Sequence, residues 1–198
     1  MSGSTELRIS DQQAERLLHA TAVLVSRAVR GQTLCSPQLE GMQECLVDGI
    51  FVSLYKGREL RACCGIIRGP HLLGPCLERA AWRAACDDPR FMPITRDELP
   101  QLHMDLHVLH DWHTCPATPA ERPAAISVGR HGLMLRRNPA AGLLLPAVAR
   151  THGWNATIFL QQCCLKAGLP SSAWQEVDCQ LELFEAQEYG SDLKLFLP

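Results

Sequence analysis

The chain has 198 residues, of which 46% are hydrophobic and 20% charged, and its formal net charge is −2. This length and composition predict one globular domain with a sizeable core, and the slightly acidic balance argues against a nucleic-acid-binding protein, which usually carries a basic face. The first residues form no hydrophobic leader and no apolar stretch approaches the ~20 residues that cross a bilayer, so we expect a cytoplasmic protein without membrane contact.

The ten cysteines of the chain are too few for a disulfide scaffold and fit a reducing compartment. No C-x-x-C pair is present, which removes the main support for a zinc ribbon or a thioredoxin-like site. We therefore expect no bound metal and no cofactor. Most of the cysteines are expected to be small buried hydrophobes.

The first part of the chain alternates between helical and strand patterns. A helical stripe over residues 10–30 begins with a capping box formed by Ser10 and Gln13. Residues 50–67 predict a hairpin with its turn at 56–59, and residues 75–87 predict a helix with a small-residue face. Trp82 lies partly off that face, where packing inside the protein is favoured over contact with a partner.

The returning strand of this hairpin carries the stretch Leu60–Gly65. Because side chains alternate along a strand, Arg61 and Cys63 are expected to share one face. The opposite face, which we expect to point into the core, carries Leu60, Ala62, Cys64 and Ile66. A guanidinium near a thiol favours the thiolate, so Cys63 is predicted to be the reactive cysteine, while Cys64 is a small hydrophobe.

Two interpretations are open for the segment 87–91, which ends the second helix. Asp88 and Arg90 either form a local structural cap, or Arg90 presents an anion-binding fork near Cys63. The cap is favoured because local ion pairs are common and functional forks are few.

The strand predicted over 102–110 belongs to a histidine-rich stretch. His103 and His107 share a face but lie ~13 Å apart at strand rise, too far to hold one ion. Together with His110 and His113, they are better interpreted as a solvated strand face than as a metal site.

The remaining chain predicts a second hairpin over 126–137, with its turn at 129–132. His131 lies in that turn, where it could act as a general base or stabilise the turn. Asn155 is a suitable N-cap for a last long helix, and residues 177–184 alternate as a strand. No repeat or linker divides the chain, and the mixture of hairpins and helices predicts an α+β fold with a mainly antiparallel sheet flanked by helices.

Several of these stretches together resemble the AMMECR domain family. Leu60–Gly65 is similar to its hexapeptide L-R-G-C-I-G, and Asp88–Phe91 matches its D-x-R-F. The blocks GRHGL at 129–133, GLLLPAV at 142–148, GW at 153–154 and KAGL at 166–169 follow in the family's order. The resemblance covers about residues 12–185 of a single domain, residues 1–198, and implies a larger and a smaller lobe.

The family resemblance also implies a functional setting. In many prokaryotic genomes the family accompanies a Memo-like protein, related to extradiol dioxygenases, and a radical-SAM enzyme, so these are the expected partners. The hexapeptide is the expected functional site. The chain departs from the family at Ala62, where the family has glycine, at Cys64, where it has isoleucine, and at Ala147, where it has glutamine.

Two functions remain open. In the first, Cys63 acts on or binds a small anionic molecule, with Arg61 and Arg90 as substrate-binding residues and His131 as the base. In the second, the chain is a non-catalytic interaction or regulatory module in which the hexapeptide is structural. A nucleic-acid regulator is disfavoured by the acidic balance.

Overall fold

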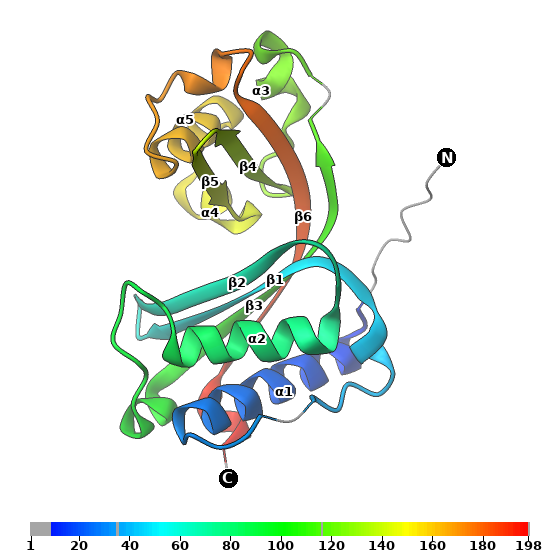
Figure 1. Ribbon diagram of the computed structural model, residues 1–198, viewed down its shortest axis with the longest axis vertical. Coiled ribbons are helices and arrows are strands. Elements are labelled where there is room, and N and C mark those ends of the chain that lie inside the picture. Colours follow the sequence, from blue (N-terminus) through cyan, green and yellow to red (C-terminus); the bar gives the residue numbers. More distant parts are fainter. Residues whose placement is uncertain (1–8, 35, 116, 198) are drawn as a thin grey trace. The chain divides into compact units, whose positions relative to one another are not determined.

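A computed structural model describes residues 9–34, 36–115 and 117–197 (Figure 1). The helices and strands are α1 (Asp11–Val29), η1 (Met42–Glu44), β1 (Leu46–Lys56), β2 (Glu59–Leu72), α2 (Leu73–Cys86), η2 (Arg96–Gln101), β3 (Leu102–Thr114), η3 (Pro119–Glu121), α3 (Arg122–Ala125), β4 (His131–Arg137), β5 (Ala140–Leu144), α4 (Pro146–His152), α5 (Ala156–Lys166), η4 (Ala173–Gln175), β6 (Gln180–Asp192) and η5 (Leu193–Phe196).

The strands are hydrogen-bonded in the order β2-β1-β3-β6-β4-β5. The pairs β1–β2, β1–β3, β4–β5 and β4–β6 are antiparallel. Helices flank the strands, so the α+β class with an antiparallel sheet is confirmed. The described residues divide into two compact units: unit 1 comprises those between 9 and 109 and between 187 and 197, and unit 2 comprises those between 110 and 186. Strands β3 and β6 each contribute residues to both units.

In unit 1, helix α2 packs against β1 and β2, and α1 packs against α2 (Figure 1). Alternate residues of the two inner strands are fully buried, namely Ile50, Val52, Leu54, Met104, Leu106 and Val108. Helix α2 meets them with the predicted small-residue face of Ala80, Ala81, Ala84 and Ala85. Small side chains allow the helix to approach the sheet closely, and the resulting apolar burial stabilises the layer.

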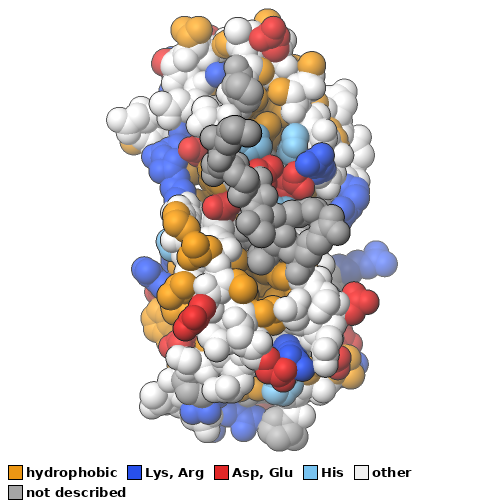
Figure 2. Space-filling view, turned by 90° about the vertical axis from the view of Figure 1, so that its right-hand side faces the viewer, with side chains coloured by type: hydrophobic (Ala, Val, Ile, Leu, Met, Phe, Trp, Pro, Cys, Tyr) orange, Lys and Arg blue, Asp and Glu red, His pale blue; other side chains and the backbone are white. Residues whose placement is uncertain are grey.

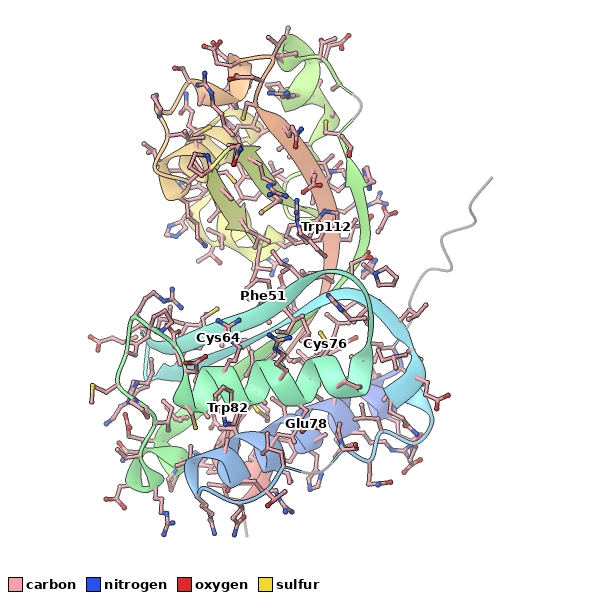
Figure 3. All side chains as sticks on the ribbon, in the orientation of Figure 1. Phe51, Cys64, Cys76, Glu78, Trp82 and Trp112 are labelled. Carbon is pink, nitrogen blue, oxygen red and sulfur yellow. The ribbon has the colours of Figure 1, made fainter. Side chains whose placement is uncertain are left out.

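Trp82 does not join this core. The side chain is 43% exposed on α2 (Figure 3), so the favoured interpretation as internal packing is wrong. The helical stripe of alanines fills the contact with the sheet, and Trp82 falls outside it.

The first helix begins as the sequence predicts. The Ser10 side chain accepts a hydrogen bond from the N–H of Gln13, and the Gln13 side chain accepts one from the N–H of Ser10. This reciprocal pair satisfies two backbone donors at the start of α1.

Unit 2 contains the β4–β5 hairpin, and α5 contacts both of its strands. Asn155 caps α5 as predicted, with its side chain accepting from the N–H of Ile158 at 2.9 Å. The vicinal pair Cys163 and Cys164 is fully buried on this helix, as the sequence predicts.

The second hairpin was predicted in the wrong place. Residues 126–128 form no strand, and β4 pairs instead with β5 across the turn at Asn138 and Pro139. The glycines at 129 and 132 resemble a hairpin turn in the sequence, but Gly129, at φ +87°, only leads the chain into β4. His131 is therefore the first residue of a strand and lies beyond the turn.

No helix among the described residues has both the length and the apolar character needed to cross a membrane. Those residues also contain no group of three or more His, Cys, Asp or Glu side chains placed to hold a metal ion. On the face drawn in Figure 2, acidic and basic side chains are interspersed, and this face has no single basic patch of the kind that binds nucleic acid.

Candidate functional site

The hexapeptide lies on β2, which is an edge strand because the strand order begins with it. An edge strand leaves backbone N–H and C=O groups without a neighbouring strand. At Cys63 two side chains take that place: the N–H of Cys63 donates to Oδ2 of Asp88 at 2.8 Å, and its carbonyl accepts from Nη2 of Arg90 at 2.8 Å. The backbone of Cys63 is thereby fixed on its open side.

Asp88 and Arg90 are themselves paired. Nε of Arg90 donates to Oδ1 of Asp88 at 3.0 Å, and Nη2 donates to Oδ2 at 2.8 Å. Only 3% of the Asp88 side chain is exposed, against 53% of the Arg90 side chain. The Arg90 guanidinium and the N–H of Cys63 lower the pKa of Asp88 to about 2, although burial opposes this. Asp88 is therefore charged at neutral pH.

Arg90 also lies beside Cys63, because its Nη2 donates to the Cys63 carbonyl at 2.8 Å. The hydrogen bond to Asp88 is the main cause that raises the pKa of Arg90. The local ion pair of Asp88 and Arg90, which the sequence favours, is present, and it sets a half-exposed guanidinium beside Cys63. An anion-binding role for Arg90 stays a prediction.

Arg61 occupies a β-bulge. Leu54 pairs with Ala62 and Tyr55 pairs with Leu60, so Arg61 is the extra residue of β2. A bulge interrupts the alternation and redirects the side chain. It also explains why Leu60 is 38% exposed. Leu60 was expected to face the core, but beyond the bulge it lies opposite Tyr55, on the other face.

The Arg61 guanidinium is held by the loop that follows α2. It donates to both carboxylate oxygens of Glu98, at 2.7 and 3.1 Å, and to the carbonyls of Met92 and Pro93 at 2.8 and 3.1 Å. These bonds use four of its five N–H donors. The same contact lowers the pKa of Glu98 to about 2, with the Arg61 hydrogen bond as the largest cause. A substrate-binding role for Arg61 stays a prediction.

The thiol of Cys63 lies on the face of the sheet opposite the core. Ala62 and Cys64 are 1% and 6% exposed, while Cys63 is half-buried, so the alternation predicted for these three residues is confirmed. Burial raises the pKa of the Cys64 thiol to about 11, so Cys64 is a small hydrophobe. The hydroxyl of Ser53, directly opposite on β1, donates to Sγ of Cys63 at 3.2 Å.

The structure explains one glycine of the hexapeptide and places two of the departures from the family. The ring of Phe51, labelled in Figure 3, lies over Gly65, where a Cβ atom would come within 2.5 Å of it. Ala62, which replaces the family's glycine, is not among the described residues with positive φ, so this position needs no glycine. The third departure, Ala147, lies in the first turn of α4 in unit 2.

His131 belongs to unit 2, whereas Cys63, Arg61 and Arg90 belong to unit 1. Its Nδ1 accepts a hydrogen bond from the N–H of Ser127 at 3.1 Å. Burial is the largest cause that lowers its pKa. These contacts fit the turn-stabilising interpretation, and the role of general base stays a prediction.

Sequence reasoning missed Ser53 and Asp105 as neighbours of the hexapeptide. Both lie on the same face as Cys63, on the next strands of the sheet. The signal for Ser53 was present in the alternation of Phe51, Ser53 and Tyr55, but it needs the register of the hairpin, and the bulge at Arg61 alters that register.

The comparisons with known proteins agree with one another. The family profile described as AMMECR1 matches residues 15–189. A protein of Aeropyrum pernix is 43% identical over 130 residues, which cover 66% of this chain and 56% of that protein. A protein of Thermococcus gammatolerans is 34% identical over 93% of both chains. The crystal structure of the uncharacterized protein PH0010 from Pyrococcus horikoshii is similar at a TM-score of 0.86 and 30% identity, covering 94% of this chain and 95% of that one.

Proposed function

The chain belongs to the AMMECR1 family, and from this we propose that its function lies in the hexapeptide Leu60–Gly65, with Cys63 as the group that binds or acts on a small anionic molecule. The observation that carries the proposal is the set of polar groups around Cys63. The buried Ser53 hydroxyl donates to the Cys63 sulfur, and the half-exposed Arg90 guanidinium donates to the carbonyl of the same residue. The buried Asp88 carboxylate accepts from the Cys63 N–H and fixes its backbone.

This arrangement suits an anionic ligand. Arg90 is 53% exposed and already lies at Cys63, so an anion approaching the sulfur meets a positive charge there. Asp88 offsets part of that charge, but it is buried behind the guanidinium and is 3% exposed. A rigid strand also holds the thiol in one orientation, as a preorganised site requires.

Alkylation with two reagents of different charge tests the proposal. Iodoacetate and iodoacetamide form the same sulfur–carbon bond, but only iodoacetate is anionic. We expect the ratio of the iodoacetate rate to the iodoacetamide rate to be severalfold higher at Cys63 than at Cys45, another partly exposed cysteine of unit 1. The ratio cancels differences in thiolate fraction, and peptide mass spectrometry measures it for each cysteine.

Charge variants complete the test. Arg90→Gln should abolish the excess at Cys63, whereas Arg83→Gln, which removes a guanidinium at a surface ion pair on α2, should leave it unchanged. Equal ratios at Cys63 and Cys45 in the native protein would contradict the proposal of an anion site. If Cys63 reacts no faster than Cys45 with either reagent, the proposal that Cys63 is a reactive thiol is wrong.

The proposal of partner proteins rests on the resemblance to the family. We propose that the Memo-like and radical-SAM proteins of the same organism act together with this site. Size-exclusion chromatography of the purified proteins, alone and mixed, tests the association. Separate elution at concentrations of tens of micromolar would contradict it.

The second candidate is a non-catalytic interaction module, with the hexapeptide as a structural element. The exposure of Trp82 favours it, because this side chain lines a 590 Å³ surface groove together with Leu34 and Pro75. Under this candidate Trp82→Ala weakens the complex with the same partners at least tenfold, while Cys63→Ala leaves it intact. The reverse result would favour the thiol site.

A further inference from the structure

Three residues on neighbouring strands form a polar row across unit 1. Cys63 of β2 pairs with Ser53 of β1, and Ser53 pairs with Asp105 of β3. Residues directly opposite one another project from the same face of a sheet. The row therefore lies on the face opposite the core, with Ser53 in its middle.

Ser53 is the buried member of the row. It is 2% exposed, although it lies among partly exposed side chains. A buried hydroxyl needs a hydrogen-bond partner, and here its donor is directed at Sγ of Cys63, 3.2 Å away.

The value of this bond depends on the charge of the sulfur. A neutral thiol is a weak acceptor, whereas a charged acceptor forms a bond about twice as strong. A fixed donor at 3.2 Å therefore stabilises the thiolate more than the thiol.

We propose that Ser53 is a positioning residue for Cys63, which orients the sulfur and favours its charged form. The inference rests on the proposed function, since it concerns the same thiol. The titratable and charged groups near Cys63 are Asp88 and Arg90, Tyr55 and Asp105 on the neighbouring strands, and, on its own strand, Cys64 on the opposite face and Arg61, which is paired with Glu98. Asp88 offsets part of the Arg90 charge, and Ser53 adds a neutral donor 3.2 Å from the sulfur.

The test is the rate of iodoacetamide alkylation of Cys63 between pH 6 and 10. In this reaction the thiol proton goes to the buffer, the sulfur forms a bond to carbon, and iodide leaves. A hydrogen bond to a charged group is worth about tenfold or more in an equilibrium. Ser53→Ala should therefore slow Cys63 about tenfold at pH 7 and move the pH–rate profile about one unit towards alkaline pH.

Three variants separate positioning from general loosening. Ser53→Thr keeps the hydroxyl and should restore most of the rate. Ser26→Ala, at another buried serine of unit 1, should change nothing. Asp105→Asn removes a charge two strands, about 10 Å, from the sulfur and should change the rate by about twofold at most.

The outcomes are distinct from those of the two-reagent experiment. A Ser53→Ala profile that superimposes on the wild-type profile overturns the inference, even if Cys63 is the fastest cysteine in the native protein. A uniform acceleration of all cysteines in Ser53→Ala also overturns it, because that indicates a structural role. A shifted Cys63 profile with unchanged rates at Cys45 supports it.

Discussion

Replacing Asp88 by Asn is the most direct test of how the site is built. The side chain is 3% exposed and accepts bonds from the Cys63 N–H and from Arg90. Lowering its pKa from 3.8 to about 2 on folding corresponds to about 2 kcal/mol of stability. One hydrogen bond to a charged group has a similar magnitude, about 1.5–3 kcal/mol. We therefore expect Asp88→Asn to reduce the free energy of unfolding by about 2 kcal/mol.

The sign of the pH dependence follows from the direction of this shift. The folded pKa is below the unfolded one, so the contribution is fully present above about pH 4 and is lost as the pH falls towards 2. Urea denaturation at pH 7, 4 and 2.5 measures it. The difference between wild type and Asp88→Asn should be about 2 kcal/mol at pH 7 and should shrink at pH 2.5.

The adjacent carboxylate provides a matched control. Asp87 is 59% exposed and lies 3.7 Å from Arg83 at the end of α2. A surface pair of this kind contributes about 0–1 kcal/mol. If Asp88→Asn and Asp87→Asn had the same small effect, the reasoning that the buried carboxylate fixes the edge of β2 would be refuted.

Three further predictions concern the surroundings of the site. Arg61→Lys should lower the free energy of unfolding by about 1–2 kcal/mol, because a lysine cannot reproduce the two-pronged contact with Glu98; urea denaturation that finds no change would show the pair to be dispensable. Gly65→Ala should cost about 1–3 kcal/mol, because its Cβ would meet the Phe51 ring at 2.5 Å, and Phe51→Leu in the same chain should recover part of the loss in thermal denaturation. Burial lowers the pKa of His131, so stability should fall as the pH drops below about 6.5, and His131→Asn should flatten that slope between pH 7 and 5.

The loop between α2 and β3 connects these predictions. Two arginines tie it to the hexapeptide from opposite directions, since Arg90 reaches from the loop to the strand and Arg61 reaches from the strand to Glu98. Arg61 and Cys63 of the Leu60–Gly65 stretch both contact this loop. A variant that weakens either pair should therefore be tested for its effect on Cys63 as well as on stability.

Local patterns in the sequence were sufficient for much of the fold. The Ser10 capping box, the buried alternation from Ala62 to Cys64 and the alanine face of α2 all depend on residues a few positions apart. Such features follow from helical and strand geometry, which is fixed by the backbone. The order of the sequence blocks also indicated the family, which the comparisons establish.

Predictions were wrong where two local patterns in the sequence favoured different structures. The glycines around His131 resembled a hairpin turn, yet the turn at Asn138 and Pro139 was the one that let two strands pair. Trp82 is exposed because the alanines of α2 form the face of the helix that packs against the sheet. A single sequence gives no means of ranking such alternatives, because the energy that decides them comes from packing between distant segments.

The sequence by itself determined that Cys63, and not Cys64, faces away from the core, because alternation along a strand requires no knowledge of other segments. Only the tertiary structure decided which groups surround that thiol. The bulge sends Arg61 to Glu98, and the turn after α2 returns Asp88 and Arg90 to the open edge of β2. These contacts join residues 25 to 37 positions apart. The edge strand accepts Asp88 and Arg90 because the N–H and C=O of Cys63 would otherwise have no strand to pair with.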